Sequence, residues 1–411
     1  MSDWKEYKLG EHIEVINGYA FKSTNFLDSF QENSLPVIKI KNVANGDVHL
    51  NDCHFHLFDK SLGKFIVDKN DILIALTGNH PETMTQVVGE TSRYKHKEKA
   101  LLNQRVAKVV AKSSINDDFL YYFLKEDSIH DYLASQSGGS ANQANISKSD
   151  IENITILLPP LPEQTAIAET LSSLDNKIDL LHSQVKILEE LAETIFRQKF
   201  IEDVTENWKV SCFSEHTEVL RGLSYKGDGL TDMNNGIPMH NLNSIYEGGG
   251  YKFEGIKYYK GVYKERHISK PGDLIIANTE QGHKLLLIGC PAIVPSYYGD
   301  LGIFSQHIYK LSLLPNTYLT TQYFYYLIKS PKVREQITGA TNGSTVNMLA
   351  IDGLQLPEFQ LPPKELILQF TALVKDIWDK KEKNYNHIQT LQKLRDTLLP
   401  KLMSGEIRIK M

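Results

Sequence analysis

The chain has 411 residues, which is long for one domain and suggests two or three. Hydrophobic residues make up 41% of it, enough to form cores, and 45 Lys and Arg against 50 Asp and Glu give a net charge of −5. This balance excludes a protein that binds polyanions through overall positive charge. Cys53, Cys212 and Cys290 lie far apart without a CxxC pair, so neither a disulfide framework nor a cysteine zinc site is expected, and a reducing cytoplasm is the expected compartment. The sequence has no apolar run of about 18 residues, so we predict no membrane span. We also expect no signal peptide at the start.

The sequence contains an internal repeat. Segment 13–22 matches segment 217–226, with Gly18 opposite Gly222, and segment 69–75 matches segment 271–277. Further pairs follow in the same order: Trp4 and Trp208, Gln104 and Gln306, Tyr121-Tyr122 and Tyr325-Tyr326, Asn145 and Asn347, Asp150 and Asp352, and Pro159-Pro160 and Pro362-Pro363. Because the partners of all these pairs lie about 200 residues apart, we infer a tandem duplication of about half the chain.

Each half begins with a mixed segment, 1–158 in the first and 204–360 in the second. Apolar runs predict strands over 37–40, 71–76, 273–277 and 306–311, and short helices over 119–124 and 323–329. Glycines at 138–139 and 248–250 indicate loops between them. Each mixed segment is therefore predicted to be a globular α+β domain.

Each half continues as a long helix, 159–203 in the first and 361–411 in the second. Apolar residues at steps of three and four predict a coiled-coil seam in both. The first seam comprises Leu171, Leu174, Ile178, Leu181, Val185, Leu188, Ala192 and Ile195, and the second comprises Phe370, Leu373, Ile377, Lys380, Asn384, His387, Leu391, Leu394 and Leu398. Pro400 is expected to end the second helix. One interpretation is that each helix, about 57 Å long, binds only an outside partner. We favour antiparallel pairing of the two helices, with a pseudo-twofold relation between the halves.

Catalytic motifs are missing from the sequence. It has no P-loop, GxSxG or HExxH, and neither an AdoMet-binding glycine loop nor an Asn-Pro-Pro-aromatic methyltransferase motif. His54 and His56 alternate as on one strand face and suggest a metal pair, but two exposed or cross-strand histidines are the favoured interpretation. Asp273 and Glu280 flank a strand as nuclease carboxylates do, yet Gln281 stands where a lysine is expected. We therefore predict no catalytic and no metal-binding residues, and a binding protein.

A pseudo-twofold molecule suits a DNA duplex, whose half-sites one turn apart are separated by roughly 34 Å. Arg and Lys suit guanine edges, Asn and Gln suit adenine edges, and Lys also suits phosphates. Polar residues of these kinds occur in matching loops of the two halves. The candidate DNA-binding residues are Lys22, Lys39, Lys41, Asn42, Thr77, Asn79, Gln104, Arg105, Asn142 and Gln143 in the first half, and Lys226, His240, Asn241, Asn243, Gln281, His283, Lys284, Gln306, Asn342 and Ser344 in the second.

Several segments resemble a known family. Segment 159–168, Pro-Pro-Leu-Pro-Glu-Gln-Thr-Ala-Ile-Ala, together with segment 174–179 closely resembles the first spacer helix of type I restriction–modification specificity (S) subunits, the HsdS family. Segment 391–408 looks like the end of their second helix. Trp4-Lys5 with Leu9-Gly10, and Trp208-Lys209, look like the starts of two target recognition domains. The resemblance covers the whole chain.

The resemblance implies a division of labour. Each recognition domain would read one half of a split, asymmetric DNA site, and the helices would set the spacing and dock two methylase (M) subunits. The assembly would methylate adenine with AdoMet held by the M subunits, and restriction (R) subunits using ATP and Mg would add cleavage, so this chain would bind no cofactor itself. Segments 24–34 and 241–265 have no counterparts in the other half, which indicates two different half-sites. The second helix opens with Lys364-Glu365-Leu366 instead of Pro162-Glu163-Gln164, a departure that weakens the case for symmetric docking.

Two other functions remain open from the residues alone. One is a duplicated coiled-coil scaffold without a role on DNA. The other is a metal-dependent nuclease that uses Asp273 and Glu280.

Overall fold

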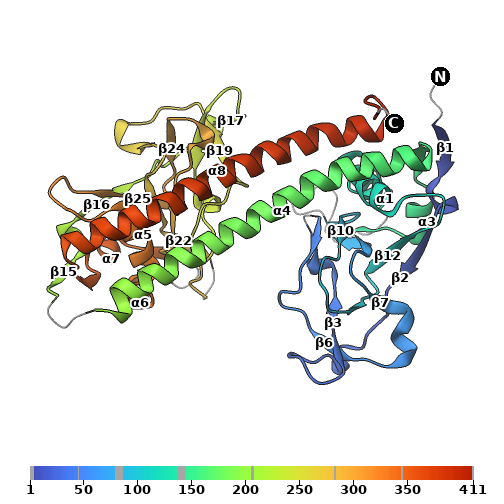
Figure 1. Cartoon of the computed structure of the whole chain (residues 1–411), viewed down its shortest axis with the longest axis horizontal. Coiled ribbons are helices and arrows are strands. Elements are labelled where there is room, and N and C mark those ends of the chain that lie inside the picture. Colours follow the sequence, from blue (N-terminus) through green and yellow to red (C-terminus); the bar gives the residue numbers. More distant parts are fainter. Residues whose placement is uncertain are drawn as a thin grey trace. The chain divides into compact units, whose positions relative to one another are not determined.

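The computed structural model describes residues 4–44, 46–78, 87–137, 144–204, 208–281, 284–343 and 346–409. The chain forms two compact units, Met1–Asp179 with Thr390–Met411 (unit 1) and Leu180–Gln389 (unit 2). Each unit contains one mixed domain and one segment of each of the two long helices, α4 (Leu161–Arg197) and α8 (Lys364–Met403) (Figure 1). The α+β architecture expected from the sequence is therefore confirmed.

The domain of unit 1 is built on two sheets. The larger sheet has the strand order β2 (Ile13–Asn17), β12 (Val106–Ala111), β8 (Ile72–Ala75), β10 (Thr91–Arg93), β5 (Asp47–Val48) and β4 (Val43–Ala44). The smaller sheet has the order β6 (Phe55–Leu57), β3 (Ser34–Ile38), β11 (Ala100–Leu102) and β7 (Ile66–Val67). Two short pairs, β1 (Lys5–Lys8) with β14 (Thr155–Leu158) and β9 (Thr77–Gly78) with β13 (Ala144–Asn145), complete the strands, and the short helices are α1 (Asp117–Leu124), α2 (Asp127–Gln136) and α3 (Lys148–Glu152).

The domain of unit 2 repeats this plan. Its first sheet has the order β16 (Thr217–Arg221), β25 (Ile308–Leu313), β21 (Leu274–Ala277) and β23 (Pro291–Ile293), which matches β2, β12, β8 and β10 strand for strand. Its second sheet has the order β17 (Leu230–Thr231), β19 (Lys257–Tyr259), β18 (Ile237–His240), β24 (Gly302–Phe304) and β20 (Ile268–Ser269). The remaining elements are β15 (Val210–Cys212) with β28 (Glu358–Gln360), β22 (Thr279–Gln281) with β27 (Val346–Leu349) and β26 (Thr341–Asn342), and the helices α5 (Thr321–Lys329), α6 (Pro331–Gly339) and α7 (Asp352–Gln355).

The central strands form because their apolar runs can be buried on both faces. All four residues of β8 and all four of β21 are buried. Asn116 caps α1 by accepting a hydrogen bond from the Phe119 amide, and every residue from Phe119 to Leu124 is buried. Helix α1 therefore packs against β10 and β12 of the larger sheet, as its apolar composition predicts.

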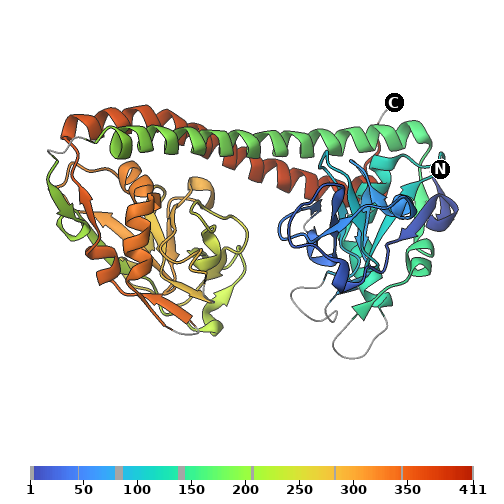
Figure 2. The same ribbon diagram turned by 90° about the horizontal axis from the view of Figure 1, so that it is seen from below.

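In each unit the segments of α4 and α8 lie side by side along one side of the domain (Figure 2). In unit 1, Asp175 of α4 pairs with Arg395 of α8, and Glu163 pairs with Arg408 beyond the end of α8. In unit 2, Glu189 pairs with Lys381, and Gln184 accepts a hydrogen bond from Asn384. Residue numbers rise along α4 while they fall along α8, so the predicted antiparallel pairing is confirmed within each unit.

The predicted packing positions differ in accuracy between the two helices. In α4, Leu171, Ile178, Leu181, Val185 and Ala192 are buried, and Leu174, Leu188 and Ile195 are half-buried. In α8, Phe370, Ile377 and Asn384 are buried, and Leu391 and Leu398 are half-buried. However, Leu373, Lys380, His387 and Leu394 were assigned wrongly, because all four side chains are exposed, Leu373 by 49% and Leu394 by 44%.

The α8 error concerns the phase of the repeat. The positions that pack are Val374, Lys381, Ile388 and Arg395, each one residue after an assigned position. Lys381 and Arg395 occupy core-facing positions because their charges pair with Glu189 and Asp175. The assigned phase instead followed Leu373 and Leu394, and Lys380 and His387 came with it at the same spacing.

The expectation that Pro400 ends the second helix is also wrong. Helix α8 continues to Met403, and the Ser404 amide still donates to the Pro400 carbonyl at 3.0 Å. Proline removes one amide hydrogen bond and crowds the carbonyl four residues before it, but Leu402 and Met403 are buried in the core of unit 1. Their burial favours continuing the helix through its last turn.

The two ends of the chain meet in unit 1. Arg408 donates two hydrogen bonds to the Glu163 carboxylate, at 2.5 and 2.7 Å, and its guanidinium lies 5.6 Å from the Trp4 ring. The Trp4 indole also donates to Glu163 at 3.1 Å. The carboxylate of the proline-rich motif thus joins both terminal segments to the start of α4.

Candidate nucleic-acid interface

Four segments of unit 1 meet at a backbone junction. The Tyr19 amide donates to the Leu102 carbonyl at 2.8 Å, and the Gln104 amide donates back to the Tyr19 carbonyl at 2.9 Å. The Asn103 amide donates to the Ile38 carbonyl at 3.1 Å, and the Leu76 amide donates to the Arg105 carbonyl at 2.9 Å. These bonds, which define the first junction, hold the loop after β2, the end of β3, the turn after β11 and the end of β8 together.

Unit 2 has an equivalent second junction. The Leu223 amide donates to Phe304 at 2.8 Å, and the Gln306 amide donates back to Leu223 at 2.9 Å. The Ser305 amide donates to the His240 carbonyl at 2.9 Å, and the Asn278 amide donates to the His307 carbonyl at 3.2 Å. The internal repeat therefore extends to individual hydrogen bonds.

Both junctions require the repeated glycine. A Cβ atom on Gly18 would lie 2.1 Å from the Asn103 carbonyl oxygen, and one on Gly222 would lie 2.1 Å from that of Ser305. Only a residue without a side chain allows such a close approach of two backbone segments.

Some of the predicted DNA-binding residues with exposed side chains lie at the two junctions, and others lie elsewhere. Gln104, Arg105 and Gln306 are exposed in the junction turns themselves. Those with exposed or half-exposed side chains elsewhere are Lys22, Lys39, Lys41, Lys226, Asn243, Lys284 and Asn342.

Two of these lysines already have contacts within the chain. The Lys39 ammonium lies 3.2 Å from Nδ1 of His54 and 4.0 Å from the centre of the Phe26 ring. Burial, and then the charge of Lys41, lower the pKa of Lys39. The Lys41 ammonium donates to the Asp52 carbonyl at 2.8 Å.

His54 and His56 pack against aromatic rings. The His54 ring lies 5.3 Å from Phe26, and the His56 ring lies 4.8 Å from Phe21. Within the described ranges of the chain, no three His, Cys, Asp or Glu side chains gather as metal ligands. His56 also lies opposite Leu35 across β3 and β6, which agrees with the cross-strand interpretation for that residue.

Four of the predicted DNA-binding side chains are buried, so the structure does not place them at the surface where DNA would contact them. Asn42 donates to the carbonyls of His49 and Asn51, while Asn241 donates to those of Met239 and Gly255. Asn42 ends one short 3₁₀ helix and Asn241 precedes another, each after a strand, and both side chains hold their loop in place.

The other two are Thr77 and His240. The Thr77 hydroxyl donates to the Asn145 side chain at 2.7 Å and so links β9 to β13. His240 is 1% exposed, and its Nδ1 lies 2.7 Å from the Tyr251 hydroxyl. Burial lowers the pKa of His240 to about 3, so the ring is neutral and supplies no positive charge for DNA.

The remaining predictions concern parts that the structure leaves undescribed. Asn79, Asn142, Gln143, His283 and Ser344 lie outside the described residues, as does the side chain of Gln281.

One exposed residue of the second junction was missed. His307 lies beside Gln306, its Nδ1 3.2 Å from the Thr279 hydroxyl and its Nε2 3.2 Å from the Gln306 amide nitrogen. The repeat aligns His307 with Arg105, and that alignment was the signal that could have identified it.

The carboxylates of the nuclease alternative have structural partners. Asp273 accepts the Lys270 amide at 2.9 Å and pairs with Lys310 at 3.3 Å, a pair that Asp71 and Lys108 repeat at 3.0 Å in unit 1. Glu280 accepts three backbone amides, from Leu286, Leu287 and Ile288, each at 2.8 Å. Both carboxylates thus shape the domain of unit 2.

Two further structural facts concern the chain as a whole. The three cysteines, Cys53, Cys212 and Cys290, carry free thiols. Among the helices that the structure describes, none combines the length and the apolar character needed to cross a membrane.

The chain is similar to known restriction–modification proteins. Residues 1–191 match the family model for the type I restriction modification DNA specificity domain. The MjaIX specificity subunit of Methanocaldococcus jannaschii is 23% identical over 99% of this chain and 94% of that protein. The EcoKI specificity subunit of Escherichia coli K12 is 22% identical over 96% of this chain and 87% of that protein.

A solved structure shares the fold. The S subunit of a type I restriction–modification system from M. genitalium is 16% identical, aligns with 100% of this chain and 97% of its own, and has a TM-score of 0.58. The family model covers the domain of unit 1 and most of α4, while the curated relatives align along almost the whole length. The chain is thus similar to type I restriction–modification specificity subunits along almost its whole length, and its first 191 residues match the DNA specificity domain of that family.

Proposed function

We propose that each domain reads one half of an asymmetric, bipartite DNA site through the loops at its junction. The observation that carries this proposal is that the same junction occurs twice with different exposed side chains, Gln104-Arg105 in unit 1 and Gln306-His307 in unit 2. Repeated backbone geometry suits two half-sites of similar shape, and different side chains suit different bases.

The two long helices set the distance between the half-sites and dock two methylase subunits. Along the unit 2 segment of α4, Leu180, Ile187 and Leu191 are 50%, 59% and 48% exposed. Steps of seven and four residues place these three side chains on one face of the helix. An exposed apolar stripe of this kind is suited to bind a partner protein.

The chain itself recognises the DNA sequence and catalyses no reaction. AdoMet is bound by the methylase subunits, and ATP and Mg are bound by the restriction subunits. Adenine methylation and cleavage follow from those partners, which also contribute cationic contacts to DNA, because this chain has a net charge of −5. The assembly works on chromosomal DNA in the cytoplasm.

The test is the pattern of adenine methylation in a methylation-free host that carries this chain and its neighbouring methylase gene. We expect a split motif that disappears when this chain is deleted. Exchange of residues 1–158 should change one half of the motif, whereas Gln306→Ala should relax only the other half. A continuous palindromic motif, or a motif that does not depend on this chain, would contradict the proposal.

The spacing role is tested by deleting one heptad from each helix. We expect a shorter gap between two unchanged half-sites. An unchanged gap in a folded variant would refute the role of the helices as a spacer.

The docking role is tested with Ile187→Asp, which places a charge in the apolar stripe. Co-purification with the methylase should be lost, while the thermal midpoint of the free chain stays unchanged. His182→Asp is the matched control, because this exposed residue lies on another side of the same helix. Equal binding by both variants would place the docking surface elsewhere.

A further inference from the structure

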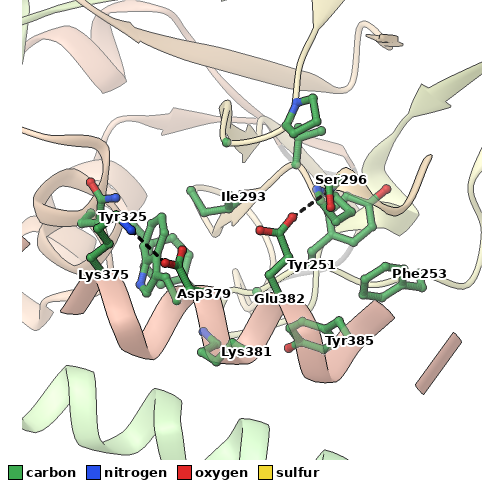
Figure 3. Close-up of a pocket in the computed structure, with 17 residues that line it drawn as sticks. Tyr251, Phe253, Ile293, Ser296, Tyr325, Lys375, Asp379, Lys381, Glu382 and Tyr385 are labelled. Carbon is green, nitrogen blue, oxygen red and sulfur yellow. Dashed lines mark hydrogen bonds and ion pairs between the residues drawn. The ribbon is translucent and has the colours of Figure 1, made fainter. Parts of the chain in front are cut away.

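Unit 2 contains a pocket of about 390 Å³ between its domain and α8. Aromatic rings of Tyr251, Phe253, Tyr325, Trp378 and Tyr385 line it (Figure 3). Pockets of this size accommodate small organic ligands, and aromatic faces attract cations.

The pocket also contains the carboxylate of Glu382. Glu382 accepts the Ser296 amide at 3.0 Å, and the described residues give it no ion pair (Figure 3). The two lysines of the pocket are engaged elsewhere: Lys375 pairs with Asp379 at 2.9 Å, and Lys381 pairs with Glu189.

The internal repeat identifies the equivalent positions in unit 1. The Asn70 amide donates to Tyr94 as the Gly272 amide donates to Val294, so the residues that follow, Lys95 and Pro295, correspond. The residues before Tyr94 and Val294, which are Arg93 and Ile293, correspond in the same way.

The helices align by a second pair of contacts. The Tyr122 hydroxyl donates to Asp175 at 2.8 Å, and the Tyr326 hydroxyl accepts from Trp378 at 3.0 Å. Asp175 and Trp378 are therefore equivalent, and four residues further along each helix Asp179 corresponds to Glu382.

Unit 1 fills these positions with its own cations. The Lys95 ammonium lies 2.7 Å from the Asp179 carboxylate, and the Arg93 guanidinium lies 4.5 Å from the centre of the Tyr121 ring. Unit 2 has Pro295 and Ile293 there, and both residues line the pocket. The carboxylate is retained while both long cationic side chains are missing.

We propose that the pocket of unit 2 binds an organic cation, an ammonium or guanidinium group on an apolar stem. The cation pairs with Glu382 as Lys95 pairs with Asp179, and the stem packs between the aromatic rings. A charge-assisted hydrogen bond in a partly buried site, with aromatic faces around it, favours such a ligand over a neutral one of the same shape.

Calorimetric titration of the full chain tests this site. The probes are n-butylguanidinium, its neutral analogue n-butylurea, and the capped peptide acetyl-Ala-Arg-Ala-amide. We expect n-butylguanidinium to bind about tenfold more tightly than n-butylurea, and Glu382→Gln to weaken it about tenfold. Tighter binding of the peptide would identify a protein side chain as the source of the cation, and tighter binding of n-butylguanidinium would identify a free small-molecule cation.

Two further variants make the test specific. Asp376→Asn removes the same charge from an exposed position of α8 and should leave the affinity unchanged. Pro295→Lys supplies an internal ammonium and should abolish binding in a chain whose circular dichroism is unchanged. Equal binding of n-butylurea, full affinity in Glu382→Gln, or no binding of either cation would overturn the proposal.

Discussion

The Asp175 carboxylate of α4 and the Arg395 guanidinium of α8 form an ion pair with an Nη1–Oδ1 distance of 2.8 Å, and neither side chain is more than 19% exposed. Tyr122 of α1 donates to the other oxygen of the same carboxylate, also at 2.8 Å. One acidic side chain thus connects the domain of unit 1 to both of its helical segments.

Loss of this carboxylate should destabilise unit 1 strongly. Asp175→Ala leaves the poorly exposed Arg395 charge with only Asp396, which is 62% exposed, as its ionic partner, and we expect a cost of about 3 kcal/mol in the free energy of unfolding. Urea unfolding measures this difference. Glu406→Ala is the control, because its pair with Lys401 is largely exposed and should contribute no more than about 1 kcal/mol. Similar losses in both variants would contradict the assigned role of Asp175.

Glu189 should make the stability of unit 2 depend on pH. Burial opposes its ionisation, but the charges of Lys381 and Lys329 outweigh burial and hold its pKa at about 2, below the ordinary 4.5. Because the pKa is lower in the folded chain, ionised Glu189 stabilises the fold above about pH 4.5, and this contribution is lost as the pH falls toward about 2. Its full size is about 3 kcal/mol.

Unfolding midpoints of the chain and of Glu189→Gln, measured from pH 6 downward, test this coupling. The difference in stability between the two should shrink as the pH falls below about 4.5. Glu190→Gln, which changes an exposed carboxylate on the same helix, should follow the unmodified chain at every pH. A constant difference for Glu189→Gln would show that its charge state does not matter.

Adjacent residues of α8 test the phase of its packing. Val374 is fully buried, so Val374→Ala should lower the free energy of unfolding by about 2 kcal/mol. Leu373→Ala removes a larger side chain but should change it by about 0.5 kcal/mol or less, because that side chain is 49% exposed. Denaturant titration of the free chain measures both. The reverse order would restore the phase expected from hydrophobicity alone.

The glycines of the two junctions should tolerate no side chain. Gly18→Ala and Gly222→Ala place a Cβ atom about 1 Å inside normal contact with a backbone oxygen, and each should cost about 3 kcal/mol or more. Gly63→Ala and Gly227→Ala are the matched controls in the same two units, because nothing lies within 4 Å of the added atom. Thermal unfolding of the four variants tests whether close backbone approach explains the repeated glycine.

Local patterns in the sequence were enough to predict much of this fold. The repeat, the buried runs 72–75 and 274–277, and the two long helices all follow from hydrophobic periodicity, which neighbouring residues determine. The exposed junction residues Gln104, Arg105 and Gln306 were identified because both halves carry a matching turn, although His307 beside Gln306 was missed.

Other features depended on contacts between distant segments. Lys381 and Arg395 face the partner helix because carboxylates about 200 residues away neutralise them, so hydrophobicity alone gave the wrong phase for Leu373 and Leu394. His240 and Asn42 resemble surface loop residues, yet each fills a hydrogen-bonded site made by other segments. The sequence by itself determined the duplication, the elements and their order, because these depend on local periodicity. Only the tertiary structure decided which polar side chains are buried with a partner and which remain available for DNA, because that depends on groups brought together by folding.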